Sequence, residues 1–177
     1  MPMGSEPEME RKFLEAYDEN VNALFRHSLM RVRNREVAKD LVQETFARTW
    51  SYLAEGKDIV HMKAFLYRTL QNLIVDTSRK KRSVSLETLQ EEDGFEPKDE
   101  SHEADAETRE EMKAAMRLLS SLDEMYASAI SMRYIEGLSP GEIAKALAVS
   151  ENVVSVRIHR GLKQLREIWR RNHNTYG

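Results

Sequence analysis

The sequence of 177 residues contains no cysteine, which excludes disulfide bonds, thiolate nucleophiles and cysteine zinc sites. It has only seven glycines and four prolines, and this scarcity of helix-breaking residues favours a largely helical protein. Long apolar runs are also missing, and the first residues are acidic and polar, so we expect neither a membrane span nor a signal peptide. The sequence predicts a cytoplasmic protein without direct membrane contact.

Patterns typical of enzymes are lacking as well. The five histidines are scattered without the spacing of metal ligands, and no glycine-rich loop could cradle a phosphate. The acidic pairs Glu91-Glu92 and Glu110-Glu111 lie in or beside a segment predicted to be mobile, whereas acid–base catalysis requires fixed geometry. We therefore expect no enzyme activity, metal, cofactor or small-molecule substrate.

Charge is abundant but unevenly distributed along the chain. Charged residues make up 32% of the sequence, and the formal net charge is -3. Residues 83–111 contain twelve acidic residues but only two basic ones, Lys98 and Arg109. Such a segment cannot bury enough apolar surface to fold alone. We predict an acidic flexible linker at 83–111 between two small helical bundles at 9–82 and 112–171.

Apolar residues at helical spacing predict three helices in the first bundle. Their expected ranges are Met9–Met30, Arg35–Leu53 and Lys63–Ser78. The third helix ends in four consecutive cations, Arg79 to Arg82, which complement the helix dipole. The same cations could also grip phosphates from the rigid end of the bundle.

The second bundle contains the pattern of a helix-turn-helix. Ser139 and Glu142 have the spacing of a capping box, and Pro140 suits the first helical position. Ser150 restarts the helix only a few residues after the first one ends, so the two helices must cross sharply. Ala148 occupies the turn where many such motifs carry glycine, which predicts a turn that is either slightly strained or differently shaped.

The helices around that motif can also be outlined. Before it, Asp123 is expected to cap a helix at Glu124–Ile135. The second helix of the motif has an apolar side, expected to pack on the first: Val154, Ile158, Leu165 and Trp169. Its other side carries arginines for guanine edges or phosphates and valine methyls for thymine methyls. A helical hairpin with a solvated basic face is the alternative.

Two ordered sets of motifs resemble those of bacterial RNA polymerase sigma factors of the extracytoplasmic function (ECF) type. The region 2 signature is carried by Asp40–Trp50, Phe65–Arg68 and Asn72–Asp76. The motifs of region 4 are carried by Arg133–Ser139, Glu142–Ala144 and Arg157–Arg160. The resemblance covers almost the whole chain, in the family's order, with a linker of suitable length.

The resemblance implies an alternative sigma factor that binds core RNA polymerase and directs promoter-specific transcription initiation. Docking on the clamp helices of the largest polymerase subunit would involve Asp40, Gln43, Glu44 and Arg48. The melted -10 element would meet Lys57, His61, Lys63, Arg68, Asn72, Arg79, Lys80, Lys81 and Arg82. The -35 duplex would be read by Asn152, Val153, Ser155, Val156, Arg157, His159, Arg160 and Lys163. The polymerase flap, promoter DNA and an anti-sigma factor are the implied partners.

Some residues depart from the family pattern. Ser155 and Val156 stand where relatives often carry lysine and serine, Asp123 replaces a usual proline, and Phe65 stands where tryptophan is common. The promoter sequence is therefore not predicted. The main alternative function is a helix-turn-helix regulator that acts as a dimer on a palindromic operator. A third, a helical adaptor, would show no salt-dependent DNA binding.

Overall fold

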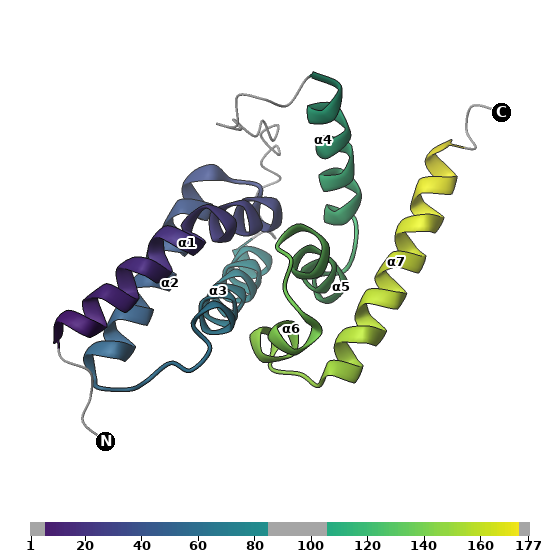
Figure 1. Cartoon of the computed structure of the whole chain (residues 1–177). Helices are drawn as coiled ribbons and strands as arrows, with labels where there is room; N and C mark the ends of the chain where they lie inside the picture. The colour runs from purple at the N-terminus through teal and green to yellow at the C-terminus, as the bar shows by residue number, and fades with distance from the viewer. Residues whose placement is uncertain (1–5, 85–105, 174–177) are drawn as a thin grey trace. The chain divides into compact units, whose positions relative to one another are not determined.

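The computed structural model describes residues 6–84 and 106–173, and every regular element in these ranges is a helix (Figure 1). The elements are α1 Glu6–Val32, α2 Arg35–Ala54, α3 Met62–Val84, α4 Ala106–Ser120, α5 Glu124–Ile130, the π-helix η1 Ser131–Ile135, α6 Pro140–Leu147 and α7 Glu151–His173. The chain divides into two compact units, one centred on α1–α3 and the other on α4, α5 and α7. The predicted all-α fold class is confirmed.

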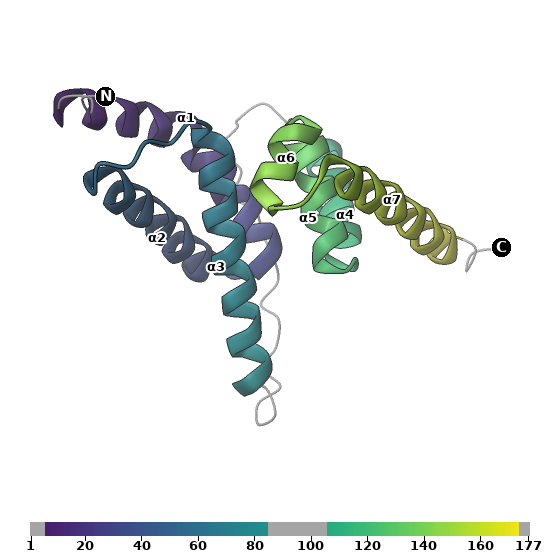
Figure 2. The same cartoon turned by 90° about the horizontal axis from the view of Figure 1, so that it is seen from below.

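The first unit is a bundle in which each of α1, α2 and α3 packs against the other two (Figure 2). Its core contains fully buried side chains from α1 and α3, among them Leu24, Leu66 and Ile74. Only two residues separate α1 from α2. Arg33 adopts a left-handed conformation with φ 52°, and the Asn34 side chain accepts a hydrogen bond from the Val37 N–H at 3.0 Å.

The second unit depends on the close approach of α7 to α5. A Cβ atom at Gly161 would lie 2.6 Å from Ile130 Cδ1 and 3.0 Å from Tyr126 Cβ. Glycine therefore allows the two helices to touch. The apolar side of α7 was expected to pack on α6, but its far end does not: Leu165 and Trp169 line a groove with α4 residues, and Trp169 is 52% exposed.

Helix boundaries also differ from the sequence prediction. Residues 83–84 belong to α3 and residues 106–111 to α4, so both ends of the expected linker are helical. The alanine and glutamate residues that begin α4 are good helix formers, and Glu110 pairs with Lys113 at 3.0 Å, one turn later. That hydrogen bond lowers the pKa of Glu110 below its ordinary value. Residues 85–105, most of the expected linker, lie outside the described residues.

The helix expected at Glu124–Ile135 is interrupted. Its α-helical part ends at Ile130, and a π-helix follows in which the Glu136 N–H donates to the Ser131 carbonyl at 3.0 Å. Asp123 precedes the helix, but its side chain makes no capping hydrogen bond, so that part of the prediction is wrong. Gly137, with φ 68°, ends the segment and turns the chain toward α6.

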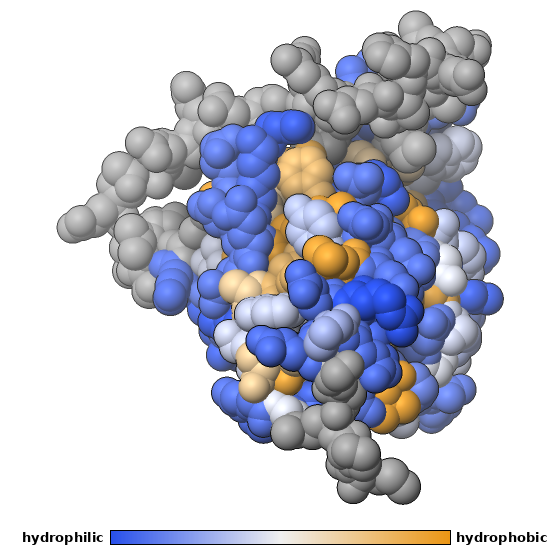
Figure 3. Space-filling view, turned by 60° about the vertical axis from the view of Figure 1, so that its left-hand side comes forward, coloured by the Kyte–Doolittle hydropathy of each residue, from blue (hydrophilic) through white to orange (hydrophobic). Residues whose placement is uncertain are grey.

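The surface is mostly hydrophilic on the face drawn in Figure 3, with separate hydrophobic patches between the polar side chains. Within residues 6–84 and 106–173, no helix combines the length and apolar character needed to cross a membrane.

Candidate nucleic-acid and protein interfaces

The helix-turn-helix is built by two caps and a strained turn. The Ser139 N–H donates to Glu142 Oε2 at 2.7 Å, and the Glu142 N–H donates to Ser139 Oγ at 3.2 Å, which confirms the predicted capping box. Ser150 Oγ accepts from the Val153 N–H at 3.2 Å and so caps α7. Between the helices, Ala148 has φ 54°, a left-handed conformation that disfavours alanine. The predicted strain in this turn is confirmed.

The outward side of α7 presents the residues predicted for the -35 element. Those that are exposed are Asn152, Val153, Ser155, Val156, His159, Arg160 and Lys163, and Arg157 is half-buried. The Ser155 hydroxyl donates to the Glu151 carbonyl at 3.1 Å, so it is engaged with its own helix. The opposite side of α7 holds the buried Val154 and Gly161. Side chains for reading a duplex therefore share one exposed surface on a helix of suitable size.

A polar stripe follows α3 in the first unit. Arg68, Asn72 and Arg79 are exposed and recur at spacings that place them on one helix face. His61 lies exposed just before α3, Lys63 is half-buried in its first turn, and Lys80 is exposed near its end. Lys81 and Arg82 lie within α3, but their side chains fall outside the described residues. The stripe offers cations and an amide to a nucleic-acid strand.

Lys57 lies in the loop before α3 and is held by its neighbours. Its ammonium group forms an ion pair with Glu55 and lies 5.0 Å from the centroid of the Tyr52 ring. The hydrogen bond to Glu55 raises the pKa of Lys57 above its ordinary value. The Tyr52 ring in turn lies 4.9 Å from the Phe65 ring. Lys57 is therefore charged but already paired, so a phosphate would have to compete with Glu55.

The four residues predicted for docking, Asp40, Gln43, Glu44 and Arg48, are all exposed on α2. Arg48 Nε lies 2.7 Å from Glu44 Oε1, one turn away. The other side of α2 carries Leu41, Val42 and Phe46, which are buried. These four residues, which we call the α2 face, therefore lie on one exposed side of the helix, and the core beneath them is complete.

An aromatic patch, which we define as Phe13, Tyr17, Phe46 and Trp50, connects α1 with α2. The Phe13 ring lies 5.1 Å from the Trp50 ring, and the Tyr17 ring lies 4.7 Å from the Phe46 ring. The helical spacing of apolar residues in the sequence places all four on the core-facing sides of the two helices, yet Tyr17 is 42% exposed and Trp50 37% exposed. The signal in the sequence was an apolar stripe on α1 too wide for one buried face.

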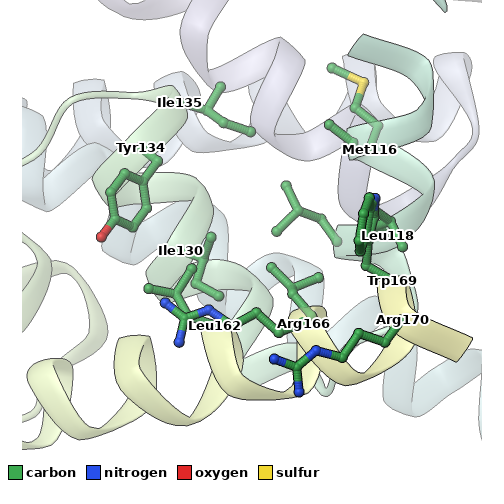
Figure 4. A pocket seen from close by; sticks show the side chains of 12 residues that line it. Met116, Leu118, Ile130, Tyr134, Ile135, Leu162, Arg166, Trp169 and Arg170 are labelled. Atoms are coloured by element: carbon green, nitrogen blue, oxygen red, sulfur yellow. The ribbon is translucent and has the colours of Figure 1, made fainter. Parts of the chain in front are cut away.

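The sequence interpretation also missed an apolar groove in the second unit (Figure 4). This groove, about 650 Å³ in volume, is lined by Ala115, Met116, Leu118, Leu119, Ile130, Tyr134, Ile135, Leu162, Leu165, Arg166, Trp169 and Arg170. Tyr134 is 62% exposed and Ile135 38% exposed. The guanidinium groups of Arg166 and Arg170 extend from α7 beside the apolar side chains. The groove has the lining expected of a site for an apolar helix.

Metal binding has no support in the described part of the chain, where no group of three histidine, aspartate or glutamate residues could hold an ion.

Comparison with known families gives two matches. Residues 16–84 match Sigma-70 region 2, and residues 112–165 match Sigma-70, region 4. Together they include the α2 face, the α3 stripe up to Val84 and the outward side of α7.

Comparison with individual proteins agrees with these matches. The chain is 29% identical over 157 residues to the ECF RNA polymerase sigma factor SigL of Mycobacterium tuberculosis, covering 85% of this chain and 84% of that protein. A sigma factor RpoE, crystallised with the anti-sigma factor NepR from Bartonella quintana, has a similar fold, with a TM-score of 0.70, 20% identity and coverage of 92% of this chain and 97% of that one. CnrH in complex with the cytosolic domain of CnrY gives a TM-score of 0.65, 22% identity and coverage of 90% and 88%.

Proposed function

The chain belongs to the sigma-70 family of bacterial RNA polymerase sigma factors, in the ECF group, and from this premise we propose how its surfaces divide the work. It is an alternative sigma factor that binds core polymerase and directs promoter-specific transcription initiation. Catalysis belongs to the polymerase, and the chain supplies binding surfaces alone. Because it works on promoter DNA with that enzyme, we place it in the bacterial cytoplasm.

The α2 face docks on the clamp helices of the largest polymerase subunit. This assignment is supported by the exposure of Asp40, Gln43, Glu44 and Arg48 on one helix face. The Glu44–Arg48 pair holds two of these side chains in a defined geometry before binding. The aromatic patch lies on the same helix at Trp50, where an apolar contact would add to the polar ones.

The α3 stripe contacts the melted -10 element, and the outward side of α7 reads the -35 duplex. An unpaired strand is held by cations along its backbone, as Arg68 and Arg79 can provide. A duplex is read by a helix in the major groove, as the capped α7 can provide. When polymerase holds both units on one promoter, each raises the effective concentration of the other.

The groove takes an apolar helix of the polymerase flap. Its support is the apolar lining from α4, η1 and α7, together with Arg166 and Arg170, which would complement acidic residues on that helix. The similar sigma factor RpoE was crystallised in complex with an anti-sigma factor, NepR from Bartonella quintana. We propose that an anti-sigma factor regulates this chain as well, by covering surfaces that polymerase needs.

One observation carries the proposal: the docking residues and the -35 residues are exposed on separate helices, α2 and α7, over separate cores. The test is run-off transcription by bacterial core polymerase, with and without the chain, on a promoter library. We expect a defined subset of promoters to become active only when the chain is present. No activation by a chain that still binds DNA as a dimer on palindromic sites would instead favour the helix-turn-helix regulator.

A further inference from the structure

Two valines lie on the outward side of α7, where their side chains contribute little to the core. Val153 is 37% exposed and Val156 40% exposed, whereas Val154 is fully buried. Valine has a lower helix propensity than alanine, so an exposed valine slightly lowers the stability of α7. Their exposure leaves both side chains available to a bound partner.

Their neighbours indicate what kind of partner this is. The valines are three residues apart, which makes their side chains neighbours on the helix surface. Arg157 follows Val153 by four residues, and Arg160 follows Val156 by four, so each valine has an arginine one turn later on the same side. The exposed Lys163 adds a further cation. Apolar groups set among cations suit the floor of a DNA groove, where phosphates lie at the edges.

Thymine supplies the matching apolar group. Its C5-methyl is the apolar group that base pairs present in the major groove. A valine in a helix has one strongly preferred χ1 rotamer, so its methyls are oriented before binding and lose little entropy on contact. Ser155, the alternative reader nearby, donates its hydroxyl to the Glu151 carbonyl instead.

We propose that Val153 and Val156 read the methyl groups of thymines on neighbouring base pairs of the -35 element. This inference rests on the proposed entry of α7 into that duplex. Arg157 and Arg160 then hold guanine edges or phosphates beside the two methyl contacts. The valines thus select for thymine, and the arginines supply guanine contacts and most of the affinity.

The experiment uses the full chain assembled with core polymerase. Promoters with randomised -35 positions are selected by binding, and each thymine of the enriched element is then replaced by deoxyuridine, which removes only the methyl group. Burial of one methyl-sized group corresponds to about a fourfold change in affinity. We expect about fourfold weaker binding at each of two thymines and no change at the others.

Substitutions assign each methyl to a valine. Val156→Ala should abolish the uracil effect at one thymine, and Val153→Ala should abolish it at the other. Both side chains are substantially exposed, so both variants should fold. Met125→Ala is the matched control, because it shortens another exposed apolar side chain, 49% exposed on α5, and should keep both uracil effects.

Several results would overturn the inference. The enriched element could lack thymine on both strands, uracil could leave binding unchanged, or both alanine variants could keep the wild-type response to uracil. Weaker binding of core polymerase by Val153→Ala or Val156→Ala, with unchanged methyl sensitivity, would assign the valines to a protein contact. Absence of any enriched sequence or transcript would instead refute the proposed function itself, together with this inference.

Discussion

The two units differ in how completely their helices cover the apolar core. In the first, α1, α2 and α3 bury a core around Leu24 and Leu66, and the polar docking face lies outside it. In the second, α7 touches α5 closely at Gly161 but leaves an apolar groove beside α4. In the first unit the proposed binding residues therefore lie outside a completely covered core. In the second unit the uncovered part of the core is itself the proposed binding surface.

The largest expected effect tests the close contact in the second unit. Gly161→Val places new atoms against Tyr126 and Ile130, and overpacking of this kind should lower the free energy of unfolding of that unit by about 3 kcal/mol. The chain has two tryptophans, Trp50 in the first unit and Trp169 in the second. Fluorescence-detected denaturation in a Trp50→Phe background therefore follows the second unit alone.

The matched control for this substitution is Gly141→Val in α6. A Cβ atom there would lie 3.2 Å from Glu151 Oε1, the end of a flexible side chain that can move aside. Its effect should stay below about 1 kcal/mol. Equal losses of stability in Gly161→Val and Gly141→Val would show that the helix contact at Gly161 is not what holds the unit together.

The groove gives the next largest effect. Trp169→Ala removes a half-exposed aromatic side chain from the groove wall, and loss of such an anchor should weaken binding of core polymerase by about 2 kcal/mol, or roughly thirtyfold. Fluorescence anisotropy of labelled chain titrated with core polymerase would measure this change. Met125→Ala should keep wild-type affinity. Normal affinity in Trp169→Ala would remove the groove from the polymerase interface.

The strained turn between α6 and α7 gives a smaller effect, and this effect is on stability. Ala148→Gly relieves a left-handed alanine and should raise the free energy of unfolding by about 1 kcal/mol. Ala146→Gly, the matched change inside α6, should lower it by about 1 kcal/mol. Denaturation of the whole chain followed by circular dichroism measures both. Destabilisation by both glycines would mean that the turn is not strained.

The smallest effect concerns the first unit and sharpens the contrast with the second. Glu44→Gln breaks the exposed pair with Arg48 and should change the free energy of unfolding by less than about 0.5 kcal/mol, because exposed ion pairs contribute little. The same substitution should weaken binding of core polymerase several-fold. Denaturation in a Trp169→Phe background and the anisotropy titration report the two quantities. A large loss of stability would contradict the view that the docking face lies outside the core.

The sequence predicted most helices and the capping box of α6 well because those depend on local chemistry. The capping box at Ser139 and Glu142, the left-handed Ala148 and the exposure of Asp40 and Gln43 all follow from residue type and spacing. Sequence patterns also indicated the family, since two motif sets occur in the right order. These features involve residues within a few turns of one another.

The features that sequence could not predict depend on which helices meet. Trp169 has the spacing of a core residue, but whether it is covered depends on how far α4 reaches along α7. Likewise, the need for glycine at position 161 comes from α5, which lies about thirty residues earlier in the chain. The exposure of Tyr17 was missed because apolar periodicity reports a face and not its partner. Contacts between distant segments decided each case.

The division of work between α2 and α7 is tested most directly by one transcription measurement. Holoenzymes of the wild-type chain and of Arg160→Ala are compared on a selected promoter with an intact or a scrambled -35 element, and Arg11→Ala serves as the control for loss of an exposed arginine. We predict that scrambling lowers transcription by the wild type and by Arg11→Ala at least tenfold but lowers transcription by Arg160→Ala by a clearly smaller factor, while all three bind core polymerase equally. The same response to scrambling in Arg160→Ala as in the wild type would contradict the account.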